Sequence, residues 1–162
     1  MITLFTATNH DTNAILAMMK NFNQDAGYHF DETTSQKTLS TFLSNKDLGR
    51  LWLIQQHETT IGYIAIAFGF SFEHGGRDGF IDELFIKPQY RGQKFGTMTL
   101  SLMQSEAKKL GVNILHLEVE PENKIAYKLY QTQGFRDNDR LLMSKKLTNS
   151  SISNTRSLLA SG

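Results

Sequence analysis

Hydrophobic residues recur along this chain with two spacings, one typical of helices and one typical of strands. Within residues 9–23 and 33–44, apolar side chains return every three or four positions, which predicts two amphipathic helices. A weaker alternation at residues 1–6 predicts a short first strand. Residues 50–56 and 60–72 are rich in Leu, Ile, Tyr and Phe and flank a polar turn, so they predict an antiparallel hairpin.

The second half of the chain alternates strands and helices. A glycine-rich turn precedes a strand at 80–87, and a broad apolar stripe then predicts a helix at 94–110. A strand is expected at 113–120, a helix at 123–133 and a final strand at 140–147. The resulting order, βααβββαβαβ, predicts an α/β fold whose central mixed sheet is covered by helices on both faces.

Length and composition fit one folded unit. The chain has 162 residues, of which 40% are hydrophobic and 20% are charged, an ordinary globular balance. We expect one domain at residues 1–147, followed by a polar, Ser- and Asn-rich tail at 148–162 that is flexible or docks on a neighbouring surface.

Charge, cysteine and histidine content argue against several classes of function. A formal net charge of +1 gives no general attraction to nucleic acid or to anionic membranes. There are no cysteines, and the five histidines lack metal-ligand spacing, so we assign no metal. The sequence shows no export-signal pattern and no apolar run approaching the ~18 residues of a membrane span, so we expect a cytoplasmic protein.

The segment IDELFIKPQYRGQKFG, residues 81–96, carries the strongest chemical signal. It joins an acidic strand to a basic, glycine-containing turn that opens a helix. Such a turn presents backbone N–H groups and the positive helix end to an anion, so it is typical of a phosphate site. A plain helix start with solvated basic residues has the same pattern about as often. The turn matches neither the Walker loop nor Gly-x-Gly-x-x-Gly, which argues against nucleoside triphosphates and dinucleotides.

Two segments together resemble the signature regions of the GCN5-related N-acetyltransferases (GNAT). They are LFIKPQYRGQKFG and LEVEPENKIAYKLYQTQGF, the latter at residues 117–135. The order of expected elements over residues 1–147 is also similar to that family's fold. The family's phosphate turn, Arg/Gln-x-x-Gly-x-Gly/Ala, falls on residues 91–96. Lys94 stands where the family has its first glycine, which adds a side chain and a charge at a crowded point.

The resemblance implies that acetyl-CoA is the cosubstrate and that it binds where the strand at 84–86 splays from the strand at 114–120. Backbone groups of the first strand would pair with the pantetheine arm, and N–H groups from Gln93 to Thr97 would bind the pyrophosphate. The implied cofactor-binding residues are Leu84, Phe85, Ile86, Arg91, Gly92, Gln93, Lys94, Phe95, Gly96, Thr97, Asn123 and Tyr127. Asn123 can equally serve as a helix cap.

Tyr130 matches the tyrosine of the family motif N-x-x-A-x-x-L-Y, here NKIAYKLY. A tyrosine hydroxyl at that position can protonate the departing CoA thiolate, so Tyr130 is our candidate acid. A packed aromatic residue with a satisfied hydroxyl is the alternative.

Three carboxylates are candidates for the general base that an ammonium acceptor requires. Asp82 and Glu83 lie on the cofactor strand and face opposite ways if that strand is regular, while Glu118 lies on the neighbouring strand. Family members that acetylate polyamines carry an acid at the position of Asp82, and those that acetylate ribosomal proteins carry one at the position of Glu118. We rank Glu83 and Glu118 slightly above Asp82, and a structural role is about as common for each.

These residues predict an N-acetyltransferase that transfers acetyl to a primary amine by direct attack in a ternary complex. Aromatic and weakly acidic residues suited to binding a cation are Tyr28, Phe30, Phe72 and Glu73. The partners would be acetyl-CoA and an amine acceptor, with homodimerisation open. The alternative is a non-catalytic acyl-CoA-binding or regulatory module with the same fold; a nucleotide-binding enzyme is a third hypothesis.

Overall fold

The computed structural model describes residues 1–148. The predicted tail therefore lies outside the described residues, apart from Thr148. Within them, no helix is both long and apolar enough to cross a membrane.

Five strands form one sheet in the order β1-β2-β3-β4-β5. Neighbouring strands are antiparallel except β4 and β5, which are parallel. The strands are β1 (Ile2–Thr6), β2 (Gly49–Gln56), β3 (Thr59–Ser71), β4 (Gly76–Ile86) and β5 (Ile114–Leu117). The predicted mixed sheet is confirmed, with strand ends that differ from the predicted ones by a few residues.

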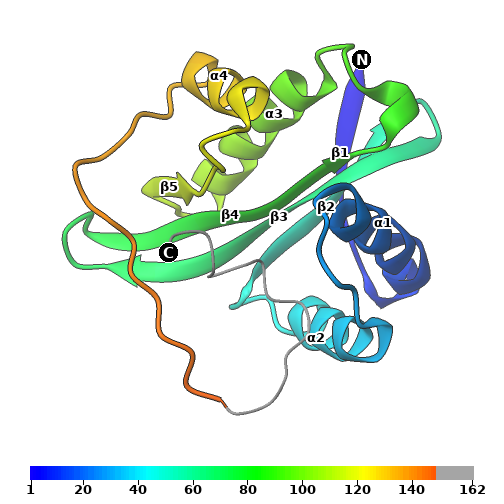
Figure 1. Ribbon diagram of the computed structural model, residues 1–162, viewed down its shortest axis with the longest axis horizontal. Coiled ribbons are helices and arrows are strands. Elements are labelled where there is room, and N and C mark those ends of the chain that lie inside the picture. Colours follow the sequence, from blue (N-terminus) through cyan, green and yellow to red (C-terminus); the bar gives the residue numbers. More distant parts are fainter. Residues whose placement is uncertain (149–162) are drawn as a thin grey trace.

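Helices cover both faces of this sheet (Figure 1). They are α1 (Thr12–Asp25), α2 (Glu32–Ser44), α3 (Phe95–Lys109) and α4 (Lys124–Thr132), with two short 3-10 helices, η1 (Asn9–Asp11) and η2 (Pro88–Tyr90). On one face, residues of α1 and α2 such as Ile15 and Leu39 pack on Tyr63 and Phe85 of the sheet. On the other face, α3 residues such as Met103 pack on the sheet side chains that point away from Tyr63 and Phe85.

Local sequence explains where helices α2 and α4 begin. The Asp31 carboxylate accepts a hydrogen bond of 2.6 Å from the Thr34 backbone N–H, and hydrogen bonding by the Thr34 side chain together with this backbone contact holds the pKa of Asp31 below its usual range. The Asn123 side chain accepts one of 3.1 Å from the Ala126 N–H in the same way. The predicted cap role of Asn123 is therefore present.

Strands β4 and β5 pair over only four residues. The pairing runs from Asp78 opposite Ile114 to Ile81 opposite Leu117, after which β4 continues alone to Ile86. This is the splay that the resemblance implied. On its β5-facing edge, the second half of β4 is therefore not paired with β5.

A β-bulge lies in β4 at the point where this pairing ends. On the β3 side, Ala65 is opposite Glu83 and Ile66 is opposite Ile81, so Asp82 is the extra residue. The strand is therefore not regular here. The expectation that Asp82 and Glu83 face opposite ways, which assumed a regular strand, does not hold, because both residues line the same pocket beneath α1 and α2.

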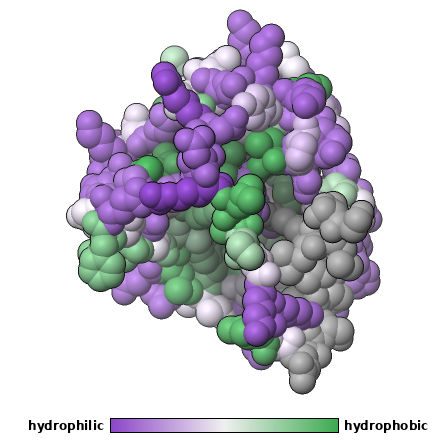
Figure 2. All heavy atoms as spheres, turned by 60° about the vertical axis from the view of Figure 1, so that its left-hand side comes forward, coloured by the Kyte–Doolittle hydropathy of each residue, from purple (hydrophilic) through white to green (hydrophobic). Residues whose placement is uncertain are grey.

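The predicted last strand at 140–147 is wrong. Residues 135–148 contain no helix or strand and run from α4 past the β3–β4 turn (Figure 1). The apolar side chains of Leu141, Leu142, Met143 and Leu147 are exposed. Figure 2 shows one face of the molecule, with hydrophobic atoms gathered in its middle. A strand needs a hydrogen-bonded neighbour as well as alternating side chains, and the described sheet ends at β5.

Candidate active site

The turn between β4 and α3 has the backbone shape of an anion site. Gly92 and Lys94 both have positive φ, 75° and 63°, and Lys94 is the N-cap of α3. The first hydrogen bond of the helix runs from the Met98 N–H to the Lys94 carbonyl, 3.1 Å. The N–H groups just before Met98 therefore lie at the positive end of α3, where an anion is favoured.

Lys94 occupies the left-handed conformation that glycine adopts without cost. The lysine at this position therefore carries some backbone strain. Gly96 has a different role, because a Cβ there would lie 3.3 Å from the Leu129 side chain of α4. A small residue at this position lets α3 and α4 approach each other.

Arg91 is tied to the end of β4 and to α1. Its Nε donates to the Ile86 carbonyl at 2.8 Å, and its Nη2 donates to the Asp25 carboxylate at 2.6 Å. Its guanidinium also stacks 5.6 Å from the centre of the Phe85 ring. These contacts fix the path of the turn relative to the strand.

Phe85 is buried beneath α1 and α2, where its ring lies 5.9 Å from that of Tyr63 and 6.5 Å from that of Phe22. Its side chain therefore holds the strand in place. The contribution of residues 84–86 to a cosubstrate would come from backbone groups, which can pair with an extended ligand arm along the β5-facing edge.

Tyr130 lies on α4 with its ring against Phe135, 5.9 Å between ring centres, beside the core under α3. Burial raises the pKa of Tyr130 above the ordinary 10.0, so its hydroxyl is protonated at neutral pH. The nearby Tyr127 donates its hydroxyl hydrogen bond to Asp137 at 2.8 Å, which raises the pKa of Tyr127 as well.

Glu83 has the most defined environment of the three candidate acids. Its Oε2 accepts a hydrogen bond of 2.7 Å from the hydroxyl of Tyr63, a residue with no exposed surface. Asp82 is more exposed and lines the same pocket. Glu118 is exposed just beyond the end of β5 and lines neither of the two main pockets.

The pocket beside these acids has a volume of about 580 Å³ and lies between α1, α2 and the sheet. Its remaining walls come from the two helices, their connecting loop and strands β2 and β3. The lining residues are Met19, Asn23, Phe30, Thr34, Ser35, Thr38, Leu39, Phe42, Leu51, Ala65, Ile66, Ala67, Asp82 and Glu83. We call it the α1/α2 pocket.

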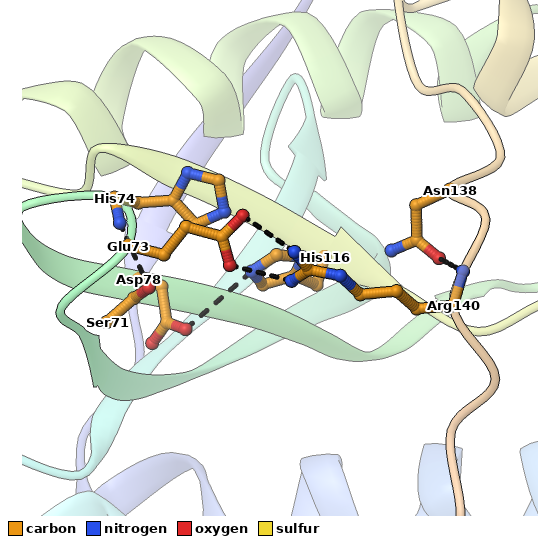
Figure 3. Close-up of polar contacts among 7 residues, drawn as sticks. All are labelled: Ser71, Glu73, His74, Asp78, His116, Asn138 and Arg140. Atoms are coloured by element: carbon orange, nitrogen blue, oxygen red, sulfur yellow. Dashed lines mark hydrogen bonds and ion pairs between the residues drawn. The ribbon is translucent and has the colours of Figure 1, made fainter.

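The four predicted acceptor-binding residues do not lie together. Phe30 lines the α1/α2 pocket, and the hydroxyl of Tyr28 donates to Glu120 at 3.1 Å. Phe72 is almost fully exposed on the β3–β4 turn, and the neighbouring Glu73 binds Arg140 through two hydrogen bonds of 2.6 and 3.0 Å (Figure 3). The Arg140 guanidinium lowers the pKa of Glu73, and the carboxylate raises the pKa of Arg140.

Glu73 belongs to a second, more polar pocket of about 660 Å³ along β5. In it His116 lies 3.6 Å from Asp78, and the ring of His74 lies 5.9 Å from that of His116 (Figure 3). No described residue lines both pockets. Within residues 1–148 no three His, Asp or Glu side chains are arranged to hold a metal ion.

Sequence reasoning placed the second helix on the substrate side but named none of its pocket residues, and it missed Tyr63. Tyr63 is opposite Phe85 in the β3–β4 ladder. The register of this ladder depends on a bulge that no pattern in the sequence indicates. On α2 the pocket residues Thr34, Ser35, Thr38, Leu39 and Phe42 recur every three or four positions, and this helical spacing is the signal that could have identified the helix face toward a pocket.

Comparison with known proteins assigns this architecture to a family of transferases. The sequence model of the Acetyltransferase (GNAT) family matches residues 15–135. The chain belongs to the GNAT acetyltransferase family.

The sequence identity between this chain and its named relatives is modest. The chain is 30% identical over 117 residues to the uncharacterized N-acetyltransferase YycN of Bacillus subtilis, covering 72% of this chain and 65% of that protein. It is 29% identical over 76 residues to the aminoalkylphosphonate N-acetyltransferase of Salmonella typhimurium, covering 47% and 49%. The chain therefore spans between about half and two thirds of these relatives.

Solved structures share the whole fold. An integron cassette protein from the mobile metagenome of the Cole Harbour salt marsh is 31% identical, with a TM-score of 0.81 and 91% coverage of both chains. A Clostridium acetobutylicum protein described as a "predicted acetyltransferase with acetyl-CoA" is 23% identical, with a TM-score of 0.75 and coverage of 90% and 96%.

Proposed function

We propose that this protein is an acetyl-CoA-dependent N-acetyltransferase that acetylates a primary amine. The observation that carries the proposal is the construction of β4. Beyond Ile81 its β5-facing edge runs to Ile86, and η2 then connects it to the left-handed turn at the start of α3, while its bulge presents Asp82 and Glu83 to the α1/α2 pocket. An anion site and an acidic pocket thus adjoin the same short strand segment.

The turn and strand edge suit acetyl-CoA in two separate ways. The pyrophosphate would accept hydrogen bonds from the N–H groups that precede Met98, and the pantetheine arm would pair with the backbone of residues 84–86. A fold relative whose structure is described as "with acetyl-CoA" supports the choice of cosubstrate.

The acceptor amine would enter from the α1/α2 pocket, and the base we favour is Glu83. An ammonium with a pKa near ~10 must lose a proton before it can attack. That proton would pass to the Glu83 carboxylate, which the Tyr63 hydroxyl positions at 2.7 Å. Asp82 shares the pocket and would hold positive charge on the approaching amine.

The transfer itself needs no covalent enzyme intermediate. The neutral amine nitrogen forms a bond to the thioester carbonyl carbon, the nitrogen then releases a second proton to solvent, and the carbon–sulfur bond breaks. The departing CoA thiolate would take a proton from Tyr130, whose hydroxyl is protonated at neutral pH. The products are an N-acetyl amine and CoA.

Titration calorimetry and an assay for thiol release test this proposal together. CoA is expected to bind, and acetyl-CoA with a panel of primary amines is expected to release one thiol for each acetylated amine detected by mass spectrometry. CoA binding without transfer to any amine or peptide N-terminus would instead identify an acyl-CoA-binding module. The strained Lys94 in the phosphate turn is the observation that favours that second candidate.

A further inference from the structure

We infer that the acceptor is a small amine with one positive charge on an apolar body, such as an arylalkylamine or alkylamine. This inference rests on the proposed function, because it concerns what occupies the α1/α2 pocket during transfer. It follows from the distribution of charge over the pocket walls.

Most of the pocket wall is hydrophobic. Side chains that would contact the body of a ligand come from α1, α2, their connecting loop and the sheet, and they are Met19, Phe30, Leu39, Phe42, Leu51 and Ala65. The volume of about 580 Å³ lies within the ~300–1,000 Å³ of typical small-molecule sites. Removing an apolar group from water into this space is favourable.

The ionisable side chains of the pocket lie on one wall. Among the described lining residues, Asp82 and Glu83 are the ionisable ones, and they are adjacent on β4. The opposite wall, on α2, offers the neutral hydroxyls of Thr34, Ser35 and Thr38. A ligand with its ammonium at the β4 wall and an uncharged remainder matches both walls.

Other classes of amine fit these walls less well. A polyamine would bring a second ammonium next to Leu39 or Phe42, where the described lining offers no carboxylate. An amine that also carries a phosphonate or carboxylate would bring an anion into a pocket whose described ionisable groups are both acids.

The test compares kcat/KM for 2-phenylethylamine with that for spermidine, 1,5-diaminopentane, 2-aminoethylphosphonate and an alanine-initiated tetrapeptide. Thiol release is measured at saturating acetyl-CoA, and each product is identified by mass spectrometry. We expect 2-phenylethylamine to exceed each of the others by about tenfold or more. A larger kcat/KM for any of the other four would overturn the inference while leaving the proposed function intact.

A charge placed on the α2 wall provides an independent check. Thr38 is exposed and lines the pocket, whereas Ser40 is exposed on the same helix and does not line it. Thr38→Asp is expected to shift the preference toward 1,5-diaminopentane by about tenfold, and Ser40→Asp is expected to leave it unchanged. Equal preferences in the two variants would show that the acceptor does not reach this wall and would overturn the inference.

Failure of the proposed function has a separate signature. In that case wild-type protein binds CoA by calorimetry but acetylates none of the five amines, and the inference falls with the function on which it rests.

Discussion

The β5-facing edge of β4 and its side toward α1 and α2 belong to one strand of 11 residues, yet they present different chemistry. The edge offers backbone groups and connects through η2 to the turn at the start of α3. The other side offers the Glu83 carboxylate, fixed by Tyr63, beside an apolar pocket. Binding through backbone tolerates an unusual residue such as Lys94, whereas binding through side chains depends on one or two identities.

The largest effect is expected on the side-chain half of this comparison. Glu83→Gln removes the base while preserving the shape of the side chain, so kcat should fall on the order of 10³-fold with the affinity for CoA unchanged. The measurement is thiol release with 2-phenylethylamine, paired with calorimetry of CoA. Asp82→Asn is the matched comparison and should lower kcat less than tenfold. Equal losses in the two variants would contradict the assignment of Glu83.

The next largest effect concerns the leaving group. Tyr130→Phe removes the hydroxyl that would protonate the departing thiolate, so kcat should fall on the order of 10²-fold. Steady-state rates between pH 7 and pH 9 measure it. The control is Tyr90→Phe, a change at another partly buried tyrosine, which lies outside both pockets and should leave kcat unaltered. An unchanged rate in Tyr130→Phe would exclude the acid role.

A smaller effect is expected on the backbone half of the comparison. Lys94 has φ of 63°, so Lys94→Gly should raise the free energy of unfolding by about 0.5–1 kcal/mol, because glycine adopts this conformation without strain. Lys94→Ala removes the charge but keeps the strain, and its stability should stay close to that of wild type. Urea denaturation distinguishes them. Equal stability of the two variants would argue against strain at this position.

The smallest effect is a difference in alkaline stability. The pKa of Tyr130 is raised in the folded state above its ordinary 10.0, because burial disfavours the phenolate. The stabilisation is fully present below pH 10 and is lost as pH rises toward the folded-state pKa. Wild type should therefore lose more stability than Tyr130→Phe above pH 10 in thermal denaturation. Parallel curves for the two proteins would show that Tyr130 is not buried as described.

The sequence was sufficient for the features that depend on neighbours along the chain. The turn at residues 91–96, the capping Asn123 and the position of Tyr130 on a helix are all local, and the structure has each of them. The sheet with helices on both faces followed from hydrophobic spacing because each element buries one side.

Features that depend on register between distant segments could not be predicted. The bulge at Asp82 is set by the pairing of Ala65 and Ile66 with β4, and nothing in residues 81–84 indicates an extra residue. The strand expected at 140–147 has the right alternation, yet alternation does not supply a hydrogen-bonded neighbour. The turn that holds Phe72 and Glu73 was expected from its glycines, but these two residues were grouped with Phe30 by residue type alone, and the fold places them outside the α1/α2 pocket.

A crystal structure of the protein with CoA and 2-phenylethylamine tests the central claim most directly. The account predicts that the amine nitrogen lies within hydrogen-bond distance of Glu83, with the phenyl ring between Leu39 and Phe42. It also predicts that the pyrophosphate accepts hydrogen bonds from the turn that Lys94 closes. An amine bound in the pocket of His116 and Arg140, or a CoA that does not touch the turn before α3, would contradict it.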